Sequence, residues 1–364
     1  MAYALIPLGM IARPLGALVL GYIGDKLGRT TALSYSLFGM ALTSLAMAFC
    51  PTFEQAGILS PIFLTLTRII SNFLSAGESM GGAIYVLENS PEKKHDWLSG
   101  LYNASTMGGI VLASLGVTVL CSLSIVETSW RYLFVMGSIT ALYGFYLRRS
   151  SNEEVLLKRD TYNILLVLKK HWIPFTQIFF ASGFSYATYS IAFLLSNGLV
   201  PLITSHSAAE MAHMNFALLL IDLITLPLFG YLAGKWGREK IMLGASLFIL
   251  LSSVPLFSLL SGAGLITIFV IRLVVVLSGV AFAAPFHAWA QDKIESPYRY
   301  QLISLAYALG SQIIGGPTAA VSLWIYKNTG TPIFASLYWM VIALPVSAML
   351  IRNLYKRLLN PSSV

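Results

Sequence analysis

The sequence predicts an all-α integral membrane protein made of two pseudo-symmetric bundles of helices. Three observations lead to this prediction: the composition, a series of long apolar segments, and an internal repeat. Of 364 residues, 57% are hydrophobic and only 10% are charged, whereas about a quarter of the residues in a soluble domain carry a charge. The composition therefore excludes an ordinary soluble protein.

Eleven segments are long enough to cross a bilayer, whose hydrocarbon core of about 30 Å needs about 20 apolar helical residues. The separation of two of them depends on the turn sequence SGAG, Ser261 to Gly264. The predicted spans are 2–23, 31–50, 61–87, 97–124, 130–148, 172–204, 212–233, 241–260, 265–289, 300–326 and 331–351.

The basic residues orient these spans. Connections on one side of the membrane hold eighteen of the 23 lysines and arginines. The positive-inside rule makes that side cytoplasmic, so residue 1 is predicted outside and the C-terminus in the cytoplasm. The net charge of +8 then reflects topology, and we expect no nucleic-acid partner.

A long polar connection divides the spans into five and six. We predict an N-terminal bundle at 1–148, a cytoplasmic linker at 149–171, a C-terminal bundle at 172–352 and a tail at 353–364. Apolar residues alternate with charges at 155–157 and 165–168, which is typical of an amphipathic helix on the membrane surface. A tether between bundles is the simpler role, and binding of a partner is the alternative.

The two halves repeat each other. The stretch GYIGDKLGRT at Gly21 recurs 209 residues later as GYLAGKWGRE at Gly230, each at the inner end of a span. Arginines inside two other spans, Arg68 and Arg272, are 204 residues apart. Such duplication is typical of transporters whose substrate path lies between the two halves.

The first copy resembles the loop signature of the major facilitator superfamily, G-x-x-x-D-[RK]-x-G-R-[RK]. It matches at Gly21, Asp25, Lys26, Gly28 and Arg29, and Thr30 replaces the final base. The second copy keeps Gly230, Lys235, Gly237 and Arg238, but Gly234 stands where the acid would be.

Longer stretches, among them GESMGGAIYVLENSPEKK, resemble the metabolite:proton symporter branch and its proline/betaine transporters. The chain departs from the branch at Ser71 and Asn72, where Gln-Gly is usual, and at Ala76, where Gly is usual before Gly77 and Glu78. The substrate therefore stays open.

The resemblance implies a proton-coupled symporter of the bacterial inner membrane that works by alternating access as a monomer. Its partners would be the lipid bilayer, a proton and a small polar metabolite: a zwitterion such as proline or betaine, or a small organic acid. No cofactor or metal is implied. The family has twelve helices, so the resemblance also implies that the first is missing, through a misplaced start or a truncated gene.

Asp25, Lys26 and Arg29 are predicted to form a conformational latch. A carboxylate and two bases at a helix end can hold the N-terminus of a neighbouring helix and a facing acid, then release both. Topological anchoring is the alternative, but it explains neither Asp25 nor the glycines. The predicted latch also includes Gly21, Gly28, Glu88, Lys235 and Arg238, although Glu88 could equally be a solvated helix end.

Charged groups inside the membrane cost about 2.5 to 3.5 kcal/mol on insertion scales, so retained ones usually serve a function. The resemblance supports an acid at Glu78, which we predict lies among apolar neighbours and carries the coupling proton. Asp222 is the second candidate. For both, a structural carboxylate paired with an arginine is the alternative.

Arg68 is a candidate for binding a substrate carboxylate, together with Arg272. It cannot pair with Glu78, because ten helical residues separate them by roughly 80° and about 15 Å. Tyr85 is a candidate for stacking on a quaternary ammonium, as are Trp289 and Tyr307, although aromatic residues at the membrane interface are common.

Other functions remain as alternatives. The fifth helix of drug antiporters carries a Gly-Pro pair, which the stretch STMGGIVLASLGV, Ser105 to Val117, lacks. A membrane sensor or an inactive remnant is a further alternative. No H-E-x-x-H or P-loop motif occurs, so we predict that the protein is not an enzyme.

Overall fold

The computed structural model describes residues 6–149 and 164–359, which are largely helical and contain no strand. Within these residues, each of the eleven predicted spans coincides with a helix or with a run of consecutive helices. Eight of these helical stretches are long and apolar enough to cross a membrane. The predicted all-α membrane architecture is confirmed.

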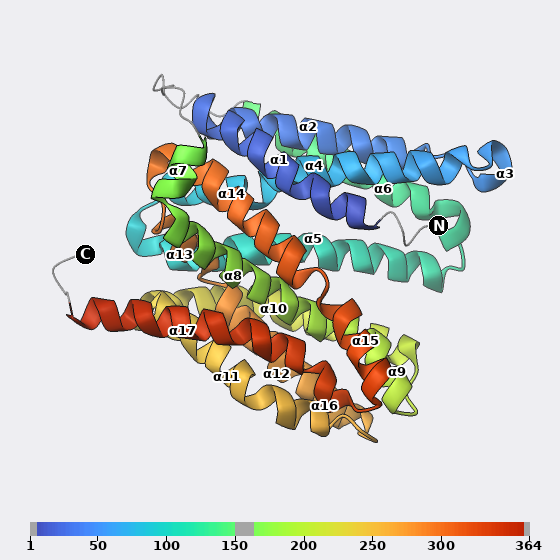
Figure 1. Ribbon diagram of the computed structural model, residues 1–364. Coiled ribbons are helices and arrows are strands. Elements are labelled where there is room, and N and C mark those ends of the chain that lie inside the picture. Colours follow the sequence, from blue (N-terminus) through green and yellow to red (C-terminus); the bar gives the residue numbers. More distant parts are fainter. Residues whose placement is uncertain (1–5, 150–163, 360–364) are drawn as a thin grey trace. The chain divides into compact units, whose positions relative to one another are not determined.

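The helices follow the chain as shown in Figure 1. Before residue 150 they are α1 (Ile6–Lys26), α2 (Arg29–Ala48), α3 (Phe53–Ala56), α4 (Leu59–Glu88), the 3₁₀ turn η2 (Glu92–Lys94), α5 (His95–Ser122) and α6 (Val126–Arg149). After residue 163 they are α7 (Ile164–Lys170), α8 (Trp172–Tyr189), the π-helical η3 (Ser190–Leu195), α9 (Ser196–Ile203), α10 (Ala208–Trp236), α11 (Arg238–Ser258), α12 (Leu265–Ala283), α13 (Phe286–Gln291), the 3₁₀ turn η4 (Ser296–Tyr298), α14 (Arg299–Leu309), the π-helical η5 (Gly310–Gly315), α15 (Thr318–Thr329), α16 (Pro332–Ala335) and α17 (Leu337–Leu359).

The chain forms two compact units, and each takes a segment from the opposite half of the sequence. Unit 1 comprises Met1–Glu88, Leu112–Phe175 and Ile294–Ala308, and unit 2 comprises Asn89–Val111, Thr176–Lys293 and Leu309–Val364. All of α14 except its last residue thus belongs with the early helices, and the part of α5 up to Val111 belongs with the late ones. The predicted division into bundles at 149–171 stays a prediction.

In unit 1, α1 packs against α2 and α4, and α2 packs against α6 (Figure 1). Small residues allow the close contact between α1 and α4. A side chain at Gly16 would collide with the backbone of Phe73, and the buried Ala17 and Ala76 pack in one cluster. Of the two apolar runs predicted for the linker, 165–168 lies in α7, and 155–157 lies outside the described residues.

In unit 2, α11 packs against α12 and α17, and α10 packs against α12. Large buried side chains fill this unit. The rings of Phe184 and Phe282 stack edge to face with centroids 4.7 Å apart, and the Trp339 indole donates a hydrogen bond to Thr188. The predicted SGAG turn separates α11 from α12, with Gly262 at φ 69°.

Candidate functional site

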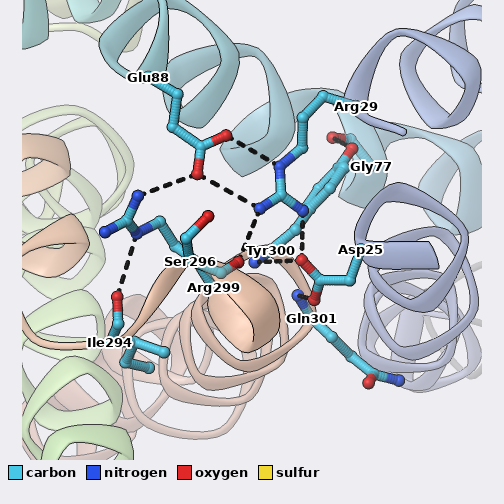
Figure 2. Close-up of polar contacts among 9 residues, drawn as sticks. All are labelled: Asp25, Arg29, Gly77, Glu88, Ile294, Ser296, Arg299, Tyr300 and Gln301. Carbon is cyan, nitrogen blue, oxygen red and sulfur yellow. Dashed lines mark hydrogen bonds and ion pairs between the residues drawn. The ribbon is translucent and has the colours of Figure 1, made fainter. Parts of the chain in front are cut away.

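The first copy of the repeated signature folds into a buried ion pair. Asp25 lies in the last turn of α1 and Arg29 in the first turn of α2, and both are 2% exposed. Gly28 joins the two helices at φ 105°, a backbone conformation that glycine adopts readily and other residues rarely do. This turn lets the Arg29 guanidinium meet the Asp25 carboxylate (Figure 2).

The Asp25 carboxylate also caps a helix from the second half of the sequence. Its Oδ1 accepts a hydrogen bond from the backbone N–H of Tyr300 at 3.2 Å, and its Oδ2 accepts one from Gln301 at 2.8 Å. Both N–H groups lie in the first turn of α14, where backbone donors lack partners in their own helix and the dipole favours an anion. Asp25 thus faces the N-terminus of a neighbouring helix, as the latch prediction requires.

Glu88, the last residue of α4, completes this cluster. Its carboxylate accepts from Arg29 Nε at 3.0 Å and from Arg299 Nη1 at 2.9 Å. Arg29 Nη2 also donates to the carbonyl oxygen of Ser296 at 3.1 Å. Two acids and two arginines therefore balance their charges at the start of α14, and we call Asp25, Arg29, Glu88 and Arg299 the first cluster (Figure 2).

Glycines of α1 and α4 allow α14 to approach these two helices closely. A Cβ placed on Gly21 would lie 2.6 Å from Gln301 Cα, and side chains at Gly24 and Gly81 would collide with the Tyr300 ring. The buried Tyr300 hydroxyl donates to the Gly77 carbonyl at 2.5 Å. Tyr300 was not predicted from the sequence, where its one indication is the glycines that make room for its ring.

Lys26 lies apart from the first cluster. Its Nζ donates to the Tyr22 hydroxyl at 2.8 Å, within α1 itself. Lys235, its counterpart in the second signature copy, is exposed. The structure brings Asp25, Arg29 and Glu88 together but not these two lysines, whose surroundings fit the anchoring alternative.

Arg238 of the second signature copy forms a similar cluster. Its guanidinium contacts Asp96 in the first turn of α5, with Nε to Oδ1 at 2.9 Å and Nη2 to Oδ2 at 3.1 Å. It also pairs with Asp292 and donates to the Ala288 carbonyl at 3.1 Å. We call Arg238, Asp96 and Asp292 the second cluster; its two acids were not predicted.

The two candidate proton carriers have different surroundings. Glu78 does not lie among apolar neighbours as predicted, because its side chain is 26% exposed and forms a two-pronged pair with Arg148, both distances being 2.8 Å. This arrangement matches the alternative of a paired structural carboxylate. Asp222 is fully buried on α10 and accepts a hydrogen bond from the Tyr189 hydroxyl at 3.1 Å.

The two repeat-related arginines also differ. Arg68 is exposed on α4, and Tyr85 on the same helix is half-buried. Arg272 is 1% exposed, and its guanidinium donates to the carbonyls of Ala192 and Met211 at 3.0 to 3.2 Å, besides Asn215. These protein acceptors explain how a cation is kept inside α12, and they argue against the predicted substrate-binding role of Arg272.

Trp289 is likewise unsuited to stacking on a ligand. It is 1% exposed, and its indole N–H donates to Glu239 at 2.9 Å. His287 lies beside it on α13, with Nε2 3.0 Å from Asn103 Oδ1. Both side chains therefore serve packing in unit 2, and of the three aromatic candidates only Tyr85 and Tyr307 stay partly exposed.

Comparison with known proteins finds membrane transporters. Residues 4–153 match the family model described as sugar (and other) transporter. A Staphylococcus aureus protein named as a candidate proline/betaine transporter is 27% identical over 94% of this chain and 76% of its own length. The proline/betaine transporter of Salmonella typhimurium is 25% identical over 94% of this chain and 72% of its own.

A solved structure confirms the fold. The crystal structure of an E. coli fucose:proton symporter superposes with a TM-score of 0.75 at 13% identity, covering 96% of this chain and 91% of that one. Together, the repeated signature, the transporter-family match, the named relatives and the shared fold identify the protein as a membrane transporter rather than an enzyme. The chain is similar along most of its length to proteins named as proline/betaine transporters, and its fold is that of solved major facilitator superfamily transporters.

Proposed function

We propose that the protein is a proton-coupled secondary transporter that moves a small polar metabolite by alternating access. The observation that carries this proposal is the first cluster, in which Asp25 and Arg29 from the first half of the sequence hold the start of α14 from the second half. Replacing a buried ion pair by apolar side chains often leaves stability unchanged or higher. The buried charges that connect the first half of the sequence to α14 are therefore better explained by a contact that opens and closes than by a gain in stability.

In this proposal the first cluster is a latch at the cytoplasmic ends of the helices. Asp25 and Arg29 hold α14, Glu88 bridges Arg29 and Arg299, and Gly21 and Gly28 give the required approach and turn. When the latch opens, the same groups can be solvated by cytoplasmic water. We also propose that the membrane is a bacterial inner membrane and that the C-terminus is cytoplasmic, because the distribution of basic residues in the sequence favours that orientation.

Asp222 is the residue we propose for proton coupling. It lies near the middle of α10 with its side chain fully buried, and its Oδ2 has no hydrogen-bond partner among the described residues. A carboxylate in this setting can alternate between a protonated and an ionised form, with the Tyr189 hydroxyl as a donor to the ionised form. Glu78 is less suitable, because its pair with Arg148 must open before it can take up a proton.

The substrate we propose is a zwitterion of the proline or betaine kind, with small organic acids as the second class. The names of the relatives support the first class. On α4, the exposed Arg68 offers donors for a carboxylate. Tyr85 offers a ring for an ammonium group, but it lies about 25 Å further along the helix, so it would contact a small solute at a different point on its path.

Uptake into proteoliposomes tests the proposal. Purified protein would be tested with labelled proline, glycine betaine, a dicarboxylate and a shikimate-like acid, with the outside more acidic than the inside. We expect uphill accumulation of at least one solute, and its loss on adding a protonophore. If folded protein moves none of them, with or without the gradient, the alternative of a sensor or inactive remnant is favoured.

A further inference from the structure

Residues of the two clusters correspond to one another at nearly constant offsets in residue number. An offset of 209 relates Arg29 to Arg238, and each follows a glycine with positive φ, at 105° and 97°. An offset of 204, the spacing of Arg68 and Arg272, relates Glu88 to Asp292. In each cluster an arginine therefore pairs with an acid at a helix end in its own half of the sequence: Glu88 ends α4, and Asp292 follows α13.

The helix held by each cluster also corresponds. The offset of 204 relates Asp96, in the first turn of α5, to Tyr300, in the first turn of α14. Both helix starts come from the half of the sequence opposite to the arginine. The close approach is repeated as well, because a Cβ on Gly230 would lie 2.6 Å from the Asp96 carbonyl oxygen, as a Cβ on Gly21 would lie 2.6 Å from Gln301 Cα.

The two clusters differ in the position of the second acid. In the first cluster it is Asp25, four residues before the arginine, and it reaches across to α14. In the second cluster that position is Gly234, and the acid is Asp96 on the helix being held. A Cβ on Gly234 would lie 3.5 Å from Asp96 Cβ and 3.7 Å from Asp96 Oδ2, so the Asp96 side chain lies where a side chain at 234 would point.

We propose that Asp96 takes the place of the missing acid in a second latch. The signature copy at Gly230 to Glu239 has Gly234 where the acid would be, and Asp96 supplies the carboxylate from α5 instead. Arg238 meets two carboxylates, as Arg29 does, although one acid has moved to the other side of the contact. The proposal rests on the alternating-access function proposed above, and it assigns Asp96 as a positioning residue that acts through Arg238.

The face of α5 that follows Asp96 is built for a separable contact. Ser99 donates to the Ala284 carbonyl at 2.5 Å, and Asn103 Nδ2 donates to the Ala283 carbonyl at 2.9 Å. Ser99, Gly100 and Asn103 lie three, four and seven residues after Asp96, which places all four on one helical face. Polar groups and a glycine, rather than large apolar side chains, would be exposed to water when such a contact opens.

A charge-relocation experiment tests this proposal. The variants are Asp96→Asn, Gly234→Asp and the two combined. Loss of one member of a buried charge pair costs several kcal/mol, so Asp96→Asn should slow uptake by about tenfold or more. Gly234→Asp alone should also slow uptake, because a third carboxylate then faces Arg238. The double variant should recover to within about twofold of the natural protein, because its acid is again four residues before the arginine, as at Asp25.

A second measurement does not depend on transport. Cys50→Ala and Cys121→Ser remove the two natural cysteines, and Ser99→Cys introduces a single cysteine at a fully buried position. A membrane-impermeant maleimide is then added on the cytoplasmic side. Labelling should be slow, about tenfold faster with Asp96→Asn, and slow again in the double variant. Glu92→Gln, an exposed acid four residues before Asp96, is the matched control and should leave labelling unchanged.

The outcomes separate the two proposals. If Asp96→Asn leaves labelling and uptake unchanged, or if adding Gly234→Asp reverses neither change, the second latch is wrong. If Asp96→Asn yields no folded protein, recovery of membrane-inserted protein in the double variant supports the proposal and its absence overturns it. If labelling follows the expected pattern but no solute is transported, the second latch stands and the proposed transport function fails.

Discussion

Asp25 accepts a hydrogen bond from the backbone N–H of Gln301 at 2.8 Å, although the two residues are 276 positions apart in the chain. The same carboxylate pairs with Arg29, which lies one helical turn further along the sequence. One side chain therefore links a local signature to the start of a distant helix.

Asp25→Asn should slow uptake by about tenfold or more while the amount of protein in the membrane stays the same. The amide can still accept a hydrogen bond, but it leaves the buried Arg29 with one carboxylate fewer, at a cost of several kcal/mol to the closed latch. The initial rate of solute uptake in proteoliposomes measures the effect. Lys26→Gln should change the rate much less, because Lys26 bonds only within α1 in the described contacts. A normal rate for Asp25→Asn would leave only the anchoring role for this stretch.

Gly21→Ala should weaken the latch by steric contact alone. The added Cβ would lie 2.6 Å from Gln301 Cα, so α14 must move away from the Asp25 carboxylate. We expect slower uptake and a lower melting temperature in detergent. Gly244→Ala is the matched control, because nothing lies within 4 Å of a Cβ there, and removing a helical glycine should stabilise by roughly 0.5 to 1 kcal/mol. Equal effects of the two variants would contradict the close approach of α14.

Asp222→Asn should abolish uphill accumulation and preserve solute exchange across the membrane at zero gradient. The amide cannot exchange a proton, but it keeps the size of the side chain and an acceptor for the Tyr189 hydroxyl. Accumulation and exchange are measured in the same proteoliposomes with and without a pH gradient. Glu78→Gln is the comparison: if it removes accumulation and Asp222→Asn does not, the coupling role belongs to Glu78.

Arg272→Leu should reduce stability, whereas Arg68→Leu should mainly change transport. Removing the Arg272 guanidinium leaves the carbonyls of Ala192 and Met211 buried without their donors, and each such loss costs about 1 to 3 kcal/mol. Melting in detergent should show a clear decrease for Arg272→Leu and little change for the exposed Arg68→Leu. For Arg68→Leu we expect a higher KM for a carboxylate-bearing solute. A stable Arg272→Leu protein with a raised KM would restore the binding role that its surroundings argue against.

Sequence alone was sufficient for the fold class, the location of the eleven helical spans and the resemblance to major facilitator transporters. These properties follow from local patterns: apolar length, turn residues such as those at 261–264, and a signature repeated at Gly21 and Gly230. A span must be apolar along its whole length wherever it packs, so its signal lies in consecutive residues.

Only the tertiary structure decided which charges meet. Asp96 carries no signature and is found only because α5 begins beside Arg238, and Glu78 proved to be paired because Arg148 ends α6 next to it. Arg68 and Arg272 match in sequence yet differ in burial. The partner of a charged side chain depends on which distant helices pack beside it, and residue spacing within one segment carries no information about that.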